Sequence, residues 1–372
     1  MTKIAPNRRQ ALTLLGGTAL SAPFVGRAWA QTTEINMLAW YGHGEPDIVG
    51  AFEEANNVKF VPKYYAGGDN MLALIAQSPP GTYDVILSDA EFVQQLNAAG
   101  YIEPLEAADY PFDDMLHEDF TKFPGHWDGD TLFSMMVRFG HLGVSYNTTA
   151  ISAEEAASYA CFWKPEVAGK VGHFDWHLPS LGMMSLYNGN GAALWELDDA
   201  GWEKVQETTM TLRPQVGGYF DYGGTFNSLK NGEMLAMCGI GDWITGVLEK
   251  DGAPVASVIP EEGGIQWTES YCIGKGSAKA ELVKTFIQYM MSPEGQVKSA
   301  QMAAYPGNVI TKAGLAALNE ADPKEAARTN QIPDDPMNPI ALIDAGRIHY
   351  RNIPINQSLE DWNDFWSEYK NA

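Results

Sequence analysis

Short apolar runs alternate with amphipathic segments over the first seventy residues that follow position 31. The apolar runs have the length of strands, and the segments between them repeat apolar positions at helical spacing. This alternation is typical of a mostly parallel sheet with helices on both faces, so it predicts an α/β fold. The expected elements are strands at 35–40, 58–65 and 83–87, a helix from Pro46 to residue 55, a helix capped by Asp69, and a helix that ends at Gly100.

The rest of the chain mixes strands and helices in a less regular order. Ser292, Pro293 and Glu294 predict a helix start, because serine caps, proline suits the first turn and an acid favours the positive end of the helix dipole. The segment 174–179 is expected to be extended and to end at its proline. The other expected elements are strands at 142–146, 234–238, 255–259 and 270–273, and helices at 200–209, 242–250, 278–291 and 358–369.

The first thirty residues have the three parts of an export signal. Arg8 and Arg9 precede an uncharged, mostly apolar run at 11–26, which ends in the small-residue pattern Ala-Trp-Ala at 28–30. The arginine pair predicts the twin-arginine export route. A membrane anchor is the alternative, but the run is shorter than the roughly 20 residues that cross a bilayer. We therefore expect residues 1–30 to be a twin-arginine-type signal peptide.

Charge and size limit the possible functions. The chain has 372 residues and a formal charge of −23, and removal of the four basic residues of the leader brings the remainder to −27. Nucleic acids need Lys and Arg against their phosphates, so this charge excludes them as partners. It favours a cationic solute through electrostatic steering, although acidity also simply keeps an exported protein soluble. About 340 residues exceed what one core usually covers, which predicts two lobes.

The sequence lacks four common catalytic and cofactor-binding motifs. It contains no nucleophile elbow, phosphate-binding loop, zinc-protease motif or dinucleotide fingerprint. His173 and His177 are four residues apart, but an extended segment between them argues against a metal site on one helix. We expect no metal and no cofactor. The three cysteines, Cys161, Cys238 and Cys272, allow at most one disulfide and also fit buried free thiols.

One segment is more specific than the rest. Residues 260–270 read PEEGGIQWTES, and shorter matches occur at 139–147, 163–165 and 305–306. With these motifs the chain resembles the bacterial periplasmic spermidine/putrescine-binding proteins, which capture substrate for ATP-driven importers. The resemblance covers essentially the whole mature chain.

The resemblance implies a two-lobed periplasmic binding protein of type II, with a ligand cleft between the lobes. It places one lobe at 31–140 plus 269–313 and the other at 141–268 plus 314–372. It also implies a monomer in the periplasm that captures a polyamine by cleft closure and docks on a membrane permease. One rival class is an exported hydrolase with Asp or His residues in the cleft. A second is a signalling module that uses the same two-lobed fold and reports its ligand to a receptor instead of a permease.

The resemblance also implies which residues bind the ligand, when the roles known in the family are assigned to the matching positions of this sequence. Trp267 and Trp40 would stack on the methylene segments of a polyamine, and Glu269 would pair with an ammonium group. Arg351 stands where the family has an uncharged polar residue; an arginine favours a carboxylate, so an amino-acid-like or other zwitterionic solute is the alternative ligand. The residues expected in the site are Trp40, Ser88, Phe139, Asp175, Trp267, Glu269, Tyr305 and Arg351.

Overall fold

The computed structural model describes residues 32–372, and the export signal expected at 1–30 lies outside the described residues. Thr33–Ala372 forms one unit that contains two main sheets. No helix within residues 32–372 is long and apolar enough to cross a membrane.

The first sheet has the order β14-β13-β3-β1-β2, with β4 and β7 also paired to β13. Strands β1, β2 and β3 are mutually parallel and are joined by helices, as the alternating pattern predicts. Strand β13 runs antiparallel to β3, β4 and β7, so the sheet is mixed. The strands are β1 (Thr33–Ala39), β2 (Val58–Tyr64), β3 (Val85–Asp89), β4 (Ile102–Glu103), β7 (Met135–Leu142), β13 (Gly264–Gly274) and β14 (Ile348–Tyr350).

The second sheet has the order β10-β9-β11-β8-β12. Strands β10, β9 and β11 are parallel to one another, and β8 is antiparallel to both β11 and β12. The strands are β8 (Val144–Asn147), β9 (Val171–Phe174), β10 (Val216–Phe220), β11 (Ala236–Cys238) and β12 (Val255–Val258). A separate two-stranded ribbon pairs β5 (Trp127–Asp128) with β6 (Thr131–Leu132).

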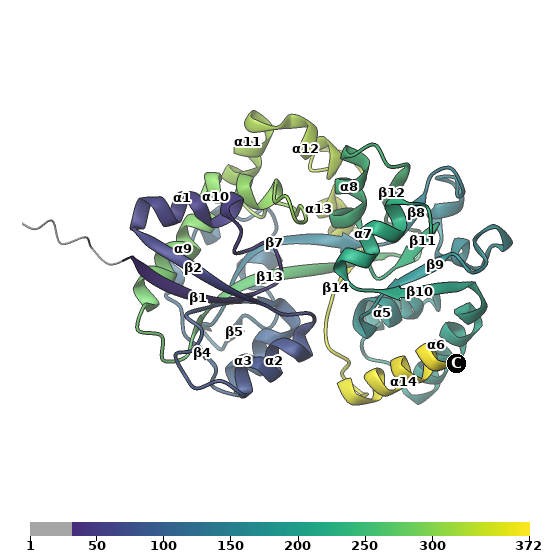
Figure 1. Cartoon of the computed structure of the whole chain (residues 1–372), viewed down its shortest axis with the longest axis horizontal. Coiled ribbons are helices and arrows are strands. Elements are labelled where there is room, and N and C mark those ends of the chain that lie inside the picture. Colours follow the sequence, from purple (N-terminus) through teal and green to yellow (C-terminus); the bar gives the residue numbers. More distant parts are fainter. Residues whose placement is uncertain (1–31) are drawn as a thin grey trace, which may run out of the picture. The chain divides into compact units, whose positions relative to one another are not determined.

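Helices cover these sheets (Figure 1). Ser292 caps α10 by accepting a hydrogen bond from the Gly295 amide, with Pro293 in the first turn, as predicted. Gly67, and not Asp69, caps α2. The helices are α1 (Pro46–Asn56), α2 (Gly68–Ala76), α3 (Val93–Ala98), α4 (Glu118–Thr121), α5 (His177–Tyr187), α6 (Asp199–Leu212), α7 (Tyr222–Lys230), α8 (Asp242–Lys250), α9 (Ala280–Met291), α10 (Pro293–Ala300), α11 (Lys312–Ala321), α12 (Pro323–Arg328), α13 (Pro339–Asp344) and α14 (Leu359–Asn371).

The expectation of an extended segment up to residue 179 is wrong beyond Trp176. Helix α5 begins at His177, so Pro179 lies in its first turn. Proline is tolerated there, because the first amide groups of a helix have no partner within the helix. Proline in this segment marks a helix start instead of a strand end.

Strands β7 and β13 connect the regions of the two sheets. Figure 1 shows them side by side, and their register pairs Trp267 with Gly140. A bridge between Leu142 and Gly241 links the end of β7 to the residue before α8. All eleven residues of β13 are buried, which explains why only its last part is predicted as a strand: a strand buried on both faces has no alternating pattern.

The strands of the second sheet come from residues 144–258, and those of the first sheet come from the segments before and after it. Strand β14 lies in the range assigned to the second lobe by resemblance, and it pairs with β13 of the first sheet. The lobe boundaries at 31–140 plus 269–313 and 141–268 plus 314–372 stay a prediction.

Candidate ligand-binding site

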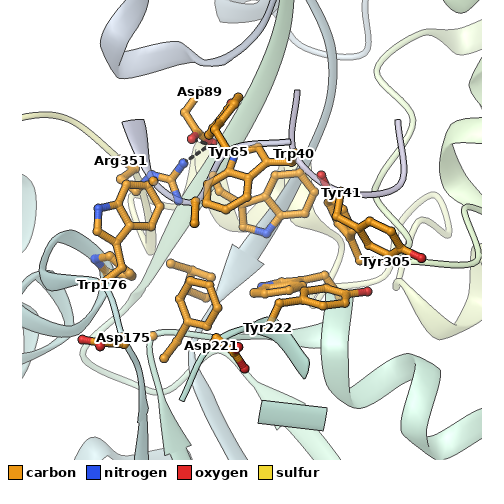
Figure 2. Close-up of a pocket in the computed structure, with 18 of the residues that line it drawn as sticks. Trp40, Tyr41, Tyr65, Asp89, Asp175, Trp176, Asp221, Tyr222, Tyr305 and Arg351 are labelled. Atoms are coloured by element: carbon orange, nitrogen blue, oxygen red, sulfur yellow. Dashed lines mark hydrogen bonds and ion pairs between the residues drawn. The ribbon is translucent and has the colours of Figure 1, made fainter. Parts of the chain in front are cut away.

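A cavity of about 500 Å³ lies where strands of both sheets end (Figure 2). Ten of its twenty lining residues are aromatic, four are carboxylates and only one, Arg351, is a cation. The aromatic residues are Trp40, Tyr41, Tyr65, Phe174, Trp176, Phe220, Tyr222, Trp243, Trp267 and Tyr305.

Strand ends position most of this lining. Trp40 follows β1, and Asp89 is the last residue of β3. On the other side, Phe174 ends β9 and Phe220 ends β10. The carboxyl ends of parallel strands are where open α/β sheets bind ligands, because the chain turns away there and leaves a crevice.

The indole of Trp267 reaches the cavity across a glycine. Gly140 faces Trp267 on the neighbouring strand, and a β-carbon at Gly140 would lie only 2.3 Å from the indole ring. Glycine at this position therefore lets the ring lie flat against the β7 backbone. The side chain is 5% exposed, so it belongs both to the core and to the cavity wall.

Glu269 lies in a buried polar network. Its carboxylate accepts hydrogen bonds from the Tyr305 hydroxyl at 2.7 Å and from Nε2 of His43 at 3.0 Å, and Nε of Arg138 is 3.2 Å away. Burial alone would raise the pKa of Glu269, but His43, the positive charge of Arg138 and these hydrogen bonds bring it to about 2.

Burial lowers the pKa of His43 below its usual 6.5, so its imidazole is neutral at pH 7. A proton on Nε2 then donates to Glu269, and Nδ1 accepts from the Tyr271 hydroxyl at 2.8 Å. Arg138, which is fully buried, is therefore the counter-charge of Glu269.

A second buried network surrounds Arg351. Its guanidinium donates to Asp89 and to Glu91, each at 2.5 Å, and lies over the Trp176 ring at 4.6 Å from the centroid. Asp89 also accepts from Nε1 of Trp40 at 2.9 Å. Burial raises the pKa of Asp89 even though Arg351 opposes it, and burial likewise raises the pKa of Glu91 to about 7.

The other two carboxylates of the cavity are exposed. Asp175 accepts from Nε1 of Trp366 at 3.0 Å, and Nζ of Lys370 contacts both of its oxygens. Asp221 caps α7, where its Oδ1 accepts from the Gly224 amide at 2.7 Å. Figure 2 shows both on the opposite side of the cavity from Asp89.

The structure brings most of the expected site residues together. Ser88 and Phe139 do not line the cavity, although both are buried. Neighbouring residues of a strand face opposite sides, so Asp89 instead of Ser88 reaches the cavity, while the Ser88 hydroxyl donates to the Asp89 carbonyl. Phe139 packs on Phe120, with ring centroids 5.1 Å apart. The expected residues that do line the cavity are Trp40, Asp175, Trp267, Glu269, Tyr305 and Arg351.

Several lining residues were not expected in the site. Asp89, Trp176 and Asp221 all stand at or just after a strand end, and this position is the signal that finds them. Tyr65, which directly follows β2, has the same signal. Trp243 has no comparable signal, because it lies in the first turn of α8 and an aromatic residue there is usually part of the core.

The part of the chain that the structure describes contains neither a candidate metal site nor a disulfide. No group of three or more His, Cys, Asp or Glu side chains in residues 32–372 could hold a metal ion. Cys161, Cys238 and Cys272 are buried free thiols.

Comparison with known proteins decides the family. The model of the bacterial extracellular solute-binding protein family matches residues 47–327. The chain belongs to this family. It is therefore a binding protein and not an enzyme, and its two sheets with a cavity at their strand ends form a periplasmic-binding-protein fold.

Curated relatives extend over most of the chain. The spermidine/putrescine-binding periplasmic protein 1 of Haemophilus influenzae is 25% identical over 299 residues, which cover 79% of this chain and 81% of the relative. The spermidine/putrescine-binding periplasmic protein of Escherichia coli is 24% identical over 327 residues, with coverage of 85% and 88%.

Solved structures share the fold at lower identity. A putative spermidine/putrescine ABC transporter protein from Listeria monocytogenes superposes with a TM-score of 0.75 at 16% identity, covering 91% of this chain and 99% of the other. The binding protein AgtB from Agrobacterium tumefaciens, in complex with agropinic acid, gives a TM-score of 0.64 at 18% identity, with coverage of 91% and 96%.

Proposed function

We propose that this solute-binding protein captures a small organic amine in the aromatic cavity and delivers it to the membrane permease of an ABC importer. A polyamine such as putrescine or spermidine is the first candidate, and the names of the curated relatives support it. The observation that carries the proposal is a cavity that is half aromatic and holds four carboxylates against one arginine. Export to the periplasm and a monomeric state are part of the same proposal.

Aromatic walls suit an alkylamine for two physical reasons. The methylene groups of the ligand leave water when they lie against flat rings, at about 25 cal/mol per Å² of apolar area. An ammonium group over an indole or phenol face gains about 0.5–2 kcal/mol. Trp40 and Trp267 offer such faces in the cavity.

The second candidate is an amino-acid-like zwitterion, and Arg351 favours it. Nε and one terminal nitrogen of Arg351 bind Glu91 and Asp89, whereas Nη1 has no hydrogen-bond partner within residues 32–372. A ligand carboxylate at this nitrogen would gain a charge-assisted hydrogen bond.

Ligand capture would work by closure of the cavity. The hydroxyl of Tyr222, at the start of α7, donates to the Ala304 carbonyl, and its ring lies 5.7 Å from that of Tyr41 after β1. These contacts join the start of α7, which follows β10 of the second sheet, to the segment after β1 of the first sheet and to the loop between α10 and α11. A ligand favours the closed arrangement only if it binds it better than the open one.

Isothermal titration calorimetry with purified protein tests the function. We expect binding of an amine from a panel of putrescine, spermidine, butylamine and 4-aminobutyrate, and loss of at least tenfold in affinity in Trp267→Ala. Trp202→Ala is the control, because Trp202 lies outside the cavity and stacks on Trp362. Circular dichroism checks that both variants fold, and Trp267→Phe keeps a ring if the alanine variant does not. No binding by any amine in the panel would overturn the proposal.

A further inference from the structure

The four carboxylates that line the cavity differ in how many of their oxygens are free. Both oxygens of Glu269 have partners: Tyr305 on one, and His43 with Arg138 on the other. Both oxygens of Asp89 are bonded as well, one to Arg351 and one to Nε1 of Trp40.

The two exposed carboxylates, Asp175 and Asp221, also differ from each other. Lys370 contacts both oxygens of Asp175, and Trp366 donates to one of them. Asp221 uses Oδ1 to cap α7, and its Oδ2 has no partner within residues 32–372. Of the eight carboxylate oxygens around the cavity, Oδ2 of Asp221 alone is unengaged in the described part of the chain.

The surroundings of Asp221 suit an ammonium group. Phe220 and Tyr222, on either side of it in the sequence, both line the cavity. The ring of Tyr222 is stacked with that of Trp243, whose indole also lines the cavity. An ammonium at Asp221 would meet one free carboxylate oxygen and aromatic groups beside it.

We propose that Asp221 receives the ammonium group of the ligand and that the cavity takes a solute with a single cationic centre. The inference rests on the proposed function, since it assumes that the cavity binds an amine, and between the two candidates it favours the amino-acid-like zwitterion over a polyamine. A second ammonium would lose its hydration without finding a free carboxylate oxygen. The rest of the solute lies against aromatic walls.

The inference assigns different effects to two similar substitutions. Asp221→Asn keeps the helix cap, because asparagine caps as well as aspartate, but removes the charge that the ammonium needs. Asp198→Asn is the matched control: Asp198 caps α6 through the same contact, from Oδ1 to the Gly201 amide at 2.8 Å, and lies outside the cavity.

Calorimetry with butylamine and putrescine as probes tests both parts of the proposal. We expect Asp221→Asn to weaken butylamine binding at least tenfold, Asp198→Asn to leave it unchanged, and Asp175→Asn to change it less than threefold. We also expect the wild type to bind putrescine no more than threefold tighter than butylamine.

The outcomes separate this inference from the function on which it rests. Unchanged amine binding in Asp221→Asn, a larger loss in Asp175→Asn, or putrescine binding tenfold or more tighter than butylamine would each overturn the inference while the amine-binding function stands. If neither probe nor any other amine of the panel binds the wild type, the proposed function itself fails.

Discussion

The two walls of the cavity both carry carboxylates, but the carboxylates of one wall are buried and those of the other are exposed. On one wall, Asp89 and Glu269 are buried and each contacts an arginine, Arg351 or Arg138. On the other, Asp175 and Asp221 are exposed at the ends of parallel strands. The comparison teaches that a carboxylate beside a cavity is not by itself a ligand site: burial forces it to find an internal partner, whereas an exposed carboxylate can keep a free oxygen, as Asp221 does and Asp175 does not.

The ion pairs of the two walls should therefore contribute differently to the stability of the folded protein. Breaking a buried ion pair by removing one partner costs about 3–5 kcal/mol, because the remaining charge stays unpaired in the low-dielectric interior. An exposed pair is worth about 0–1 kcal/mol. Substitutions on the two walls therefore test the comparison directly.

The largest expected effect is that of Arg351→Met. It leaves Asp89 and Glu91 buried without their shared counter-charge, and we expect a loss of about 3–5 kcal/mol in the free energy of unfolding, measured by urea denaturation at pH 7. Lys370→Met is the comparison variant, since it removes a cation from the exposed wall. A loss of less than 1 kcal/mol in Arg351→Met would show that the two walls do not differ.

Glu269→Gln should give the next largest effect, and one that depends on pH. The pKa of Glu269 is about 2 in the folded chain and 4.5 in the unfolded chain, a difference of about 3 kcal/mol. Because the folded value is the lower one, this stability is present above pH 4.5 and is lost as the pH falls towards 2.

Urea denaturation of the wild type and Glu269→Gln at several pH values between 2.5 and 7 measures this difference. Glu103→Gln serves as control, because Glu103 pairs with Lys275 at the surface, and its effect should stay below about 1 kcal/mol throughout. A pH-independent difference between wild type and Glu269→Gln would contradict the assignment.

The smallest expected effect on stability is that of Lys370→Met, below about 1 kcal/mol. This substitution frees Oδ2 of Asp175 on the exposed wall, while Oδ1 still accepts from Trp366, so the cavity gains a second available carboxylate oxygen. We expect putrescine to gain several-fold in affinity relative to butylamine, measured by calorimetry. An unchanged ratio of the two affinities would mean that Asp175 does not reach the ligand even when it is free.

Site residues that a local motif marks can be predicted from the sequence, whereas contacts between residues far apart in the sequence cannot. Trp40, Trp267 and Tyr305 line the cavity, and a local motif or a strand end marks each of them in the sequence. The pairing of Glu269 with Arg138 depends on strand register, and that of Arg351 with Asp89 joins residues more than 250 positions apart. No local pattern carries such information.

The sequence by itself determined the α/β class, most strand and helix positions, the family and the aromatic character of the site. These features depend on periodicity, on caps such as Ser292 and on short motifs, all of which act over a few residues. Only the tertiary structure decided which charges are already neutralised and which oxygen, on Asp221, is left for a ligand. The physical reason is that the availability of a charge depends on its burial and on its neighbours in space, and both arise when distant strands meet.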